Sequence, residues 1–281
     1  MKAASFRFLR ARSVVDAVAL KADYGEDARF IAGGQSLVPA LNLRLLEPRA
    51  LIDIAGLRDL SGVLLADGRL VIGALTRHAQ LSNDPLIAAH APLLLRALPY
   101  VAHAAIRNRG TFGGSIALAD PAAEWPACCL ALDAEMIFTG PQVTGERRIA
   151  AADFFRGLYA TALGPDDLLL RVELPIQKPG ARSVALELAR RHGDFAIVGI
   201  VGTCLDSKLG GLRLSLFGVA DRPLRFPTVE KLLMAGEMAP AIAELKQKLD
   251  PPSDPCHSSA TKKYLAGVLL QRAINQLRSH G

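Results

Sequence analysis

The sequence predicts an α+β protein with two domains. Its 281 residues exceed the length of one average domain, and a composition of 51% hydrophobic and 21% charged residues is that of a folded chain with a buried core. Strand and helix patterns are mixed in the first part of the chain. Three closely spaced strand patterns, followed by helices, make up the remainder.

The first part begins with a helix and continues with a strand, a glycine turn and a second helix. Apolar residues recur at helical spacing over residues 13–24, with Ser13 as the expected N-cap and Gly25 as the stop. A strand at 29–32 ends at a glycine pair, and a helix follows from residue 37. Further strands are expected at 50–54, 70–75, 135–139 and 168–174, and a long helix at 85–100 in which Pro92 marks a turn or kink.

A polar, turn-forming segment separates the two expected domains. Pro175 and residues 178–180 contain the proline and glycine that break regular structure, which places the boundary between residues 177 and 178. The short spacing of the strands beyond this boundary predicts an antiparallel meander. These strands are expected at 183–188, 196–205 and 212–220, and two helices, at 229–234 and 261–277, are expected to close the chain.

Charge, hydropathy and cysteine content exclude several classes of protein. The net charge of +6 comes from scattered basic residues without interleaved aromatic residues, which favours a generally basic surface over a nucleic-acid site. The longest apolar stretch, 195–205, falls short of the roughly 20 residues that cross a bilayer, and no apolar signal segment opens the chain, so a cytoplasmic location is expected. The four cysteines lack C-x-x-C spacing, which favours buried reduced thiols over zinc or iron–sulfur ligands.

Two glycine pairs have the features of phosphate-binding loops. Residues 32–37, Ala-Gly-Gly-Gln-Ser-Leu, combine glycines that allow positive φ and close backbone approach with a hydroxyl and a following helix. Such a hexapeptide alone is more often only a turn. Residues 111–117, Thr-Phe-Gly-Gly-Ser-Ile-Ala, repeat the same features, so the two loops could grip a pyrophosphate from opposite sides. Neither loop fits the Rossmann or the P-loop pattern.

These motifs, in this order, resemble the medium, flavin-binding subunit of the carbon monoxide dehydrogenase and xanthine dehydrogenase superfamily. The resemblance covers nearly the whole chain, including residues 32–37, 106–117, 119–127, 159–175 and the Gly-Asp-Phe-Ala motif at 193–196. It implies an FAD-binding fold of the PCMH (vanillyl-alcohol-oxidase-like) type at 1–177, with α/β subdomains at about 1–60 and 61–177. A C-terminal α+β domain with a three-stranded antiparallel sheet is implied at 178–281.

The resemblance also implies which residues contact FAD. Glu124 occupies an acidic position near the ribityl chain, where a carboxylate can accept hydrogen bonds from hydroxyls. Asp120 is the second carboxylate of this stretch, with a helix cap before Pro121 as the alternative. The pyrophosphate is expected to lie between Ala32, Gly33, Gly34, Gln35, Ser36 and Leu37 on one side and Ile106, Thr111, Gly113, Gly114, Ser115 and Ala117 on the other.

Three further residues are aligned near the flavin ring. Leu169 matches a position that packs near the ring, with a plain strand-core leucine as an equal alternative. Phe195 stands where relatives commonly carry tyrosine, so the ring can stack but the hydroxyl is lost. Glu187 aligns roughly where relatives carry lysine, and a reversed charge there would lower the flavin potential. For Glu187 we favour the alternative of a solvent-facing position on an edge strand.

Other polar residues receive no assigned role. His78, His103 and His192 are single histidines, and no catalytic or metal-binding residue is assigned. Arg107 and Arg109 could steer an anionic phosphate or contact a partner subunit. The loops contain no cysteine or histidine, so the FAD is expected to be noncovalent.

The function implied by the resemblance is electron transfer through FAD. A small subunit with [2Fe-2S] clusters and a large subunit with the molybdenum cofactor and the substrate site are the implied partners, arranged as a dimer of heterotrimers. Two alternatives are a self-sufficient FAD oxidase and a non-catalytic interaction protein that has lost its flavin. The C-terminal part lacks an evident acid/base cluster for the first, and the two intact glycine loops disfavour the second.

Overall fold

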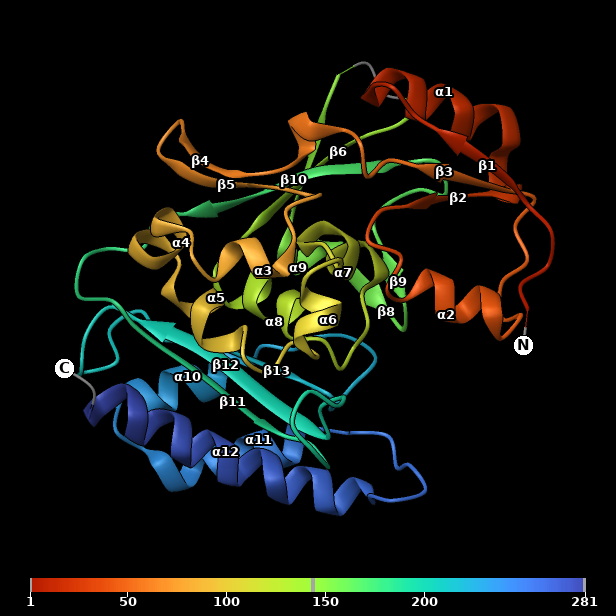
Figure 1. Ribbon diagram of the computed structural model, residues 1–281. Helices are drawn as coiled ribbons and strands as arrows, with labels where there is room; N and C mark the ends of the chain where they lie inside the picture. Colours follow the sequence, from red (N-terminus) through yellow and green to blue (C-terminus); the bar gives the residue numbers. More distant parts are fainter. Residues whose placement is uncertain (1, 143–144, 280–281) are drawn as a thin grey trace.

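The computed structural model describes residues 2–142 and 145–279 and has four layers (Figure 1). A five-stranded sheet, a layer of short helices, a three-stranded sheet and three C-terminal helices follow one another, and a small unit with its own parallel sheet lies beside the first sheet. The α+β class expected from the sequence is therefore confirmed. Within the described part of the chain, no helix combines the length and apolar character that crossing a membrane requires.

The N-terminal unit is a three-stranded parallel sheet with the order β1-β3-β2. The expected cap at Ser13 is present, because its hydroxyl accepts a hydrogen bond from the Asp16 amide over 3.1 Å. Gly25 ends the helix with a φ of 53°. The elements of this unit are β1 (Arg7–Arg10), α1 (Val14–Tyr24), η1 (Gly25–Asp27), β2 (Ala28–Ile31), α2 (Leu37–Asn42), β3 (Ala50–Asp53) and η2 (Arg58–Leu60).

The five-stranded sheet is antiparallel, with the order β4-β5-β10-β6-β7. One face packs on a cluster of apolar residues from the short helices. A β-bulge between Leu169 and Arg171 shifts the alternation, so Leu169 shares this face with Val172. The strands are β4 (Val63–Ala66), β5 (Arg69–Gly73), β6 (Glu135–Thr139), β7 (Arg147–Ala150) and β10 (Leu168–Pro175), and β8 (Phe155–Gly157) pairs with β9 (Ala160–Thr161) nearby.

Short helices fill the space between the five-stranded sheet and the C-terminal three-stranded sheet (Figure 1). The turn expected at Pro92 is confirmed, and it divides the segment 85–100 into two helices instead of one long helix, because the chain breaks at Ala91, where φ is −145° and ψ is 54°. Pro92 has no amide hydrogen and begins a new helix. The helices are α3 (His78–Leu81), α4 (Pro85–His90), α5 (Pro92–Ala97), α6 (Ala104–Arg107), α7 (Phe112–Leu118), α8 (Glu124–Ala131) and α9 (Ala151–Phe154).

The C-terminal part contains the expected antiparallel meander, with the order β11-β12-β13. Its strands are β11 (Arg182–Leu188), β12 (Val198–Cys204) and β13 (Arg213–Phe217). Two closing helices were expected, but the structure has three, α10 (Pro227–Met234), α11 (Met238–Lys248) and α12 (Ser259–Ser279). The sequence hides α11 because only Ala241 and Leu245 of this helix are buried, which leaves almost no apolar stripe.

The central strand β12 is buried on both faces, which explains its continuous apolar sequence. Val201 packs with the short helices, whereas Val198 and Ile200 pack with the C-terminal helices. The thiols of Cys128, Cys129 and Cys204 are buried as expected, but Cys256 is exposed, so a buried position for all four cysteines is wrong.

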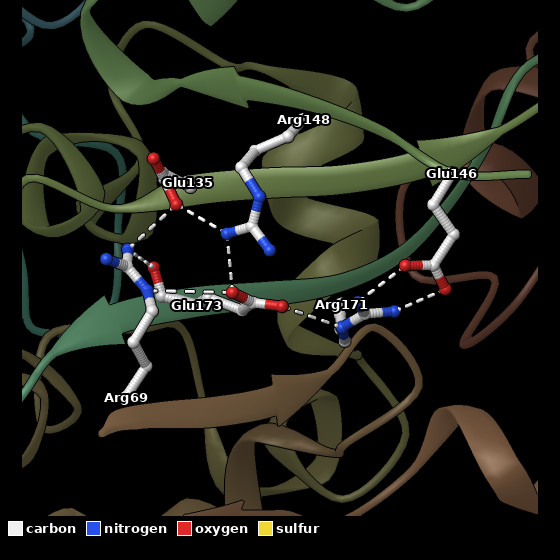
Figure 2. A network of polar contacts seen from close by, with 6 residues as sticks. All are labelled: Arg69, Glu135, Glu146, Arg148, Arg171 and Glu173. Atoms are coloured by element: carbon white, nitrogen blue, oxygen red, sulfur yellow. Dashed lines mark hydrogen bonds and ion pairs between the residues drawn. The ribbon is translucent and has the colours of Figure 1, made fainter. Parts of the chain in front are cut away.

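The outer face of the five-stranded sheet carries a network of three arginines and three glutamates (Figure 2). Glu173 lies at its centre, with 8% of its side chain exposed, and accepts from Arg148 over 2.6 Å and from Arg171 over 3.0 Å. Arg171 also donates two hydrogen bonds of 2.6 Å to Glu146. The remaining members are Arg69 and Glu135. The three arginines and three glutamates give the network a formal net charge of zero.

Candidate functional site

The first glycine loop joins β2 to α2 and leaves a run of backbone amides unpaired. The Ile31 carbonyl accepts from the Ile54 amide over 3.0 Å, which fixes the end of the strand. The backbone N–H groups of residues 33–36 donate to no acceptor in the described part of the chain. The Gln35 side chain donates to the Gly33 carbonyl over 2.9 Å and so braces the loop. Unpaired consecutive amides are the feature that an anion requires.

The two glycine loops are in direct contact. A Cβ built on Gly33 would overlap the Arg109 carbonyl oxygen and lie 2.8 Å from the Gly110 Cα atom. No side chain fits at this position without moving the backbone of the second loop. The structure thus brings together two segments that lie far apart in the sequence, with glycine required where they touch.

The second loop uses its amides within the protein, which differs from the expectation for both loops. The Phe112 amide donates to the Thr76 carbonyl over 2.8 Å, and the Gly113 amide donates to the Ala74 carbonyl over 2.9 Å. Gly114 donates to the Thr111 hydroxyl over 3.1 Å, which caps α7. The polar groups that this loop can offer to a ligand are therefore side-chain hydroxyls, those of Thr111 and Ser115.

The four glycines of the two loops are required for different reasons, and a positive φ requires glycine at only one of these positions. Gly34 has a φ of +71°, whereas Gly33, Gly113 and Gly114 do not have positive φ. A Cβ on Gly113 would lie 2.5 Å from the Ala74 Cβ atom, so close packing against the end of β5 requires this glycine. The expectation of positive φ at Gly33 and Gly114 is therefore wrong, and close contact is the constraint at Gly33 and Gly113.

Around the second loop, three of the side chains in question are exposed, whereas that of Arg107 is held by backbone carbonyl groups. Ile106 on α6 is 36% exposed, and Ala117 on α7 is exposed. Arg107 donates to the carbonyls of Val101 and Ala102 over 3.0 and 2.8 Å, so its guanidinium holds the backbone rather than facing a phosphate. Arg109 has an exposed side chain, beside the loop contact.

The two carboxylates after the second loop have different surroundings. Glu124 begins α8 and is 8% exposed, and no ion pair among the described residues includes its side chain. Burial, and then the charge of Asp120, raises the pKa of Glu124 to about 7. Asp120 accepts from the Ala122 amide over 2.9 Å, which closes a turn ahead of α8. Asp120 therefore caps this turn and not the helix itself.

Tyr159 is a member of this site that the sequence did not single out. Its hydroxyl donates to Asp120 over 3.3 Å, and its backbone has a φ of +52°, which is unusual for a residue with a side chain. Burial, followed by the charge of Asp120, raises the pKa of Tyr159. The signal was the Tyr-Ala-Thr-Ala-Leu motif at 159–163, which contributed to the resemblance but received no role.

Glu187 is only partly exposed, so the favoured alternative of a solvent-facing residue on an edge strand holds for the strand but not for the whole carboxyl group. It lies on the edge strand β11, but its Oε2 atom is buried without a hydrogen-bond partner among the described residues. Burial, and then the charge of Glu124, raises the pKa of Glu187 to about 8. A carboxyl group at this position therefore carries less than a full negative charge at neutral pH.

Leu169 and Phe195 differ in how well they can reach a ligand. Leu169 is 5% exposed and packs in the core beneath the five-stranded sheet, which supports its structural interpretation. Phe195 is 70% exposed on the loop between β11 and β12. That loop packs on the segment before α6, because a Cβ on Gly193 would lie 2.9 Å from the Ala102 carbonyl oxygen. Phe195 is thus carried to the same side as the second loop and remains available for stacking.

His78 supports the second loop, a role that sequence reasoning missed. Its amide donates to the Gly110 carbonyl over 3.0 Å, and its Nδ1 accepts from the Trp125 indole over 3.0 Å. Burial, and then the charge of Arg107, lowers the pKa of His78 to about 4, so the ring is neutral at pH 7. Such a ring positions its neighbours and is not a proton donor in the neutral range.

Comparison with known proteins gives matches over nearly the whole chain. Residues 4–177 match the family model of the FAD binding domain in molybdopterin dehydrogenase, and residues 186–277 match the CO dehydrogenase flavoprotein C-terminal domain. The 6-hydroxypseudooxynicotine dehydrogenase complex subunit alpha of Paenarthrobacter nicotinovorans is 36% identical over 282 residues, covering 98% of this chain and 95% of the relative. The carbon monoxide dehydrogenase medium chain of Afipia carboxidovorans is 34% identical over 284 residues, covering 98% and 97%.

Solved structures agree with these matches. Reconstituted CO dehydrogenase from Oligotropha carboxidovorans superposes with a TM-score of 0.95 at 32% identity, covering 100% of both chains. The family indicated by the two glycine loops is thereby confirmed. The chain belongs to the FAD-binding medium subunits of the molybdenum hydroxylases, and its role is that of an FAD-dependent electron-transfer subunit.

Proposed function

We propose that the two glycine loops hold the pyrophosphate of a noncovalent FAD. The unpaired amides of residues 33–36 support this assignment most directly, because they supply donors that nothing in the described chain uses. The hydroxyls of Thr111 and Ser115 face the pyrophosphate from the second loop. The residues of the clamp are Ala32, Gly33, Gly34, Gln35, Ser36 and Leu37 with Ile106, Thr111, Gly113, Gly114, Ser115 and Ala117.

The remaining contacts of FAD fall to the residues around the start of α8. Glu124 accepts hydrogen bonds from the ribityl hydroxyls. Asp120, which accepts a hydrogen bond from Tyr159, lies beside Glu124. Phe195 offers an aromatic ring for the flavin, whereas Leu169 supports the site from the core. When bound, the flavin supplies the chemistry, since it can take up electrons singly and release them in pairs.

The substrate is oxidised on another chain in this proposal. The relatives are named as subunits or chains of dehydrogenase complexes, which supports assembly with partner subunits. We assign the [2Fe-2S] clusters to a small subunit, the molybdenum cofactor and substrate site to a large subunit, and a dimer of heterotrimers to the complex. The FAD-binding domain spans 1–177 and the C-terminal domain 178–281 in this proposal.

Reconstitution of the full chain with FAD tests the site. The wild-type chain is expected to retain one flavin after desalting, seen in its visible spectrum. Gly33→Ala is expected to lose it, because the new methyl group overlaps the second loop, whereas Gly56→Ala is the control, since a Cβ there meets nothing within 4 Å. Failure of the wild-type chain to retain FAD, or retention by Gly33→Ala equal to that of Gly56→Ala, would show that the loops are not the clamp.

A further inference from the structure

A short hairpin beside the candidate site ends in a turn with an unfavourable backbone conformation. β8 and β9 pair with Gly157 opposite Ala160, so Leu158 and Tyr159 form the turn between the strands. Tyr159 has a φ of +52°, a left-handed conformation that glycine and asparagine adopt more easily than tyrosine does. A residue held in this conformation costs free energy that the rest of the fold must offset, and such residues cluster at functional sites.

The hairpin is anchored by both parts of the chain. Phe154 and Phe155 are buried at its base, with their rings edge-on and their centroids 5.1 Å apart. β9 contacts α7, the helix of the second glycine loop (Figure 1). From the C-terminal part, Arg222 donates to the Arg156 carbonyl over 3.0 Å. The position of the turn is therefore fixed, while its tip remains exposed.

Tyr159 connects this exposed tip to a buried carboxylate. Tyr159 is 57% exposed, whereas Asp120 is 8% exposed, and the Tyr159 hydroxyl donates to Oδ2 of Asp120 over 3.3 Å. The other carboxylate oxygen, Oδ1, accepts from the Ala122 amide over 2.9 Å. Because each oxygen has its own donor, the plane of the Asp120 carboxylate is fixed.

Asp120 keeps unused capacity to accept hydrogen bonds. An ionised carboxylate offers about four acceptor positions, and the contacts to Tyr159 and Ala122 occupy two of them. Across residues 2–142 and 145–279, no ion pair includes Asp120. The next residue, Pro121, is held through its carbonyl, which accepts from the Gly218 amide over 2.8 Å. A fixed carboxylate with free acceptor positions and no cation suits a ligand that carries hydroxyl groups.

We propose that Tyr159 is a positioning residue of the FAD site, which holds the Asp120 carboxylate in the orientation that accepts a hydrogen bond from a hydroxyl of FAD. The inference rests on the proposed FAD site, in which Asp120 lies beside Glu124 near the ribityl chain. The bond of 3.3 Å is longer than the roughly 2.8 Å typical of hydroxyl donors, and Tyr159 is exposed. The Tyr159 hydroxyl therefore adds little to the stability of the apo chain and acts on FAD affinity through Asp120.

Titration of the apo chain with FAD tests this role. Tyr159→Phe keeps the ring and removes the hydroxyl, so the dissociation constant is expected to rise about threefold to tenfold while the apo Tm stays the same. Tyr264→Phe is the matched control, because Tyr264 is similarly exposed, at 63%, but lies on α12. Equal FAD affinity of Tyr159→Phe and Tyr264→Phe overturns the proposal. A wild-type chain that binds no FAD overturns the proposed function instead.

A glycine variant separates the positioning role from a structural one. Tyr159→Gly relieves the left-handed backbone, so its apo Tm is expected to equal or exceed that of the wild type. Its FAD affinity is expected to fall at least as far as that of Tyr159→Phe, because the hydroxyl is absent from both. An apo Tm below that of the wild type would show that Tyr159 holds the hairpin together and would overturn the positioning role.

The Asp120→Asn background shows whether Tyr159 acts through the carboxylate. A hydrogen bond to an ionised acceptor is roughly twice as strong as one between neutral groups. Tyr159→Phe is therefore expected to raise the dissociation constant of FAD by a smaller factor in Asp120→Asn than in the wild-type chain. An equal factor in both backgrounds means that Tyr159 does not act through Asp120, and it overturns the proposal.

Discussion

Trp125 donates a hydrogen bond from its indole nitrogen to Nδ1 of His78 over 3.0 Å, and both side chains are buried. The Trp125 ring also meets Phe112 edge-on, with ring centroids 5.4 Å apart. His78 supports the second glycine loop through Gly110, and Trp125 follows Glu124 on α8. The second glycine loop and the Glu124 carboxylate therefore share one rigid support, which fixes their relative positions before any ligand binds.

Removing the acceptor of this hydrogen bond should destabilise the chain. In His78→Leu the buried indole N–H of Trp125 loses its partner, which costs about 1–3 kcal/mol. Chemical denaturation followed by far-UV circular dichroism measures the change in the free energy of unfolding. His192→Gln, at an exposed histidine, is the control and should change this free energy by less than about 0.5 kcal/mol. Equal stability of the two variants would contradict a structural role for the hydrogen bond.

The same histidine should make the chain sensitive to acid. Its pKa is lowered from 6.5 to about 4 in the folded state, so between these values the unfolded chain binds a proton that the folded chain does not. Stability therefore falls as the pH is lowered from about 6.5 towards 4. His78→Gln should lack this part of the dependence, although it is less stable at pH 7. Unfolding free energies measured at several pH values decide this, and parallel curves for the two proteins would refute it.

Glu187 should have the opposite effect at higher pH. Its folded-state pKa is raised from 4.5 to about 8, so the folded chain keeps a proton that the unfolded chain releases. The stability of the wild-type apo chain then falls as the pH rises from about 4.5 to about 8 and changes no further above that range. Glu187→Gln avoids the penalty, and its Tm should exceed that of the wild type by a margin that grows over this range.

The size of that margin follows from protein size, since each kcal/mol shifts the Tm of a chain of this kind by about 2–4 °C. Glu244→Gln is a control with the opposite sign, because hydrogen bonds from Lys248 and Thr228 lower the pKa of Glu244. A Tm difference between Glu187→Gln and wild type that stays constant from pH 5 to 9 would exclude a raised pKa at this residue.

The sequence predicts the elements of this fold better than the way their faces are used. The cap at Ser13 and the meander of β11, β12 and β13 depend on neighbouring residues, so local patterns predict them. The orientation of Glu187 depends on the packing of β11 against α5, which lies across the domain boundary. When helices cover both faces of a sheet, alternation shows that two faces exist but not that a charged residue points inward.

The site divides in the same way. The glycine pairs identify both loops, because close approach of two backbones allows few other residues. The motif does not show how the backbone amides are used. In the second loop they donate to carbonyl groups at the end of β5 and to the Thr111 hydroxyl that caps α7. His78 and Tyr159 reach the site through long-range contacts, so their partners Trp125 and Asp120 cannot be inferred from the residues beside them in the sequence.

The network on the outer face of the five-stranded sheet should depend on its central member. Glu173 contacts Arg69, Arg148 and Arg171 with only 8% of its side chain exposed, so Glu173→Gln leaves three guanidinium groups without their shared carboxylate (Figure 2). Removing one partner of a buried ion pair in this way lowers the free energy of unfolding by about 3 kcal/mol. Although burial alone would raise it, hydrogen bonds from Arg148 and Arg171 keep the pKa of Glu173 below its usual value.

Glu146 provides the matched comparison in the same network. It contacts only Arg171 there, with 47% of its side chain exposed, so Glu146→Gln should cost less than about 1 kcal/mol. Raising the salt concentration should reduce the small loss in Glu146→Gln more than the loss in Glu173→Gln, because salt screens exposed charges and hardly reaches buried ones. Urea denaturation at low and high salt measures both differences. If the two variants lose the same stability at both salt concentrations, the network acts as a set of independent surface pairs and Glu173 has no central role.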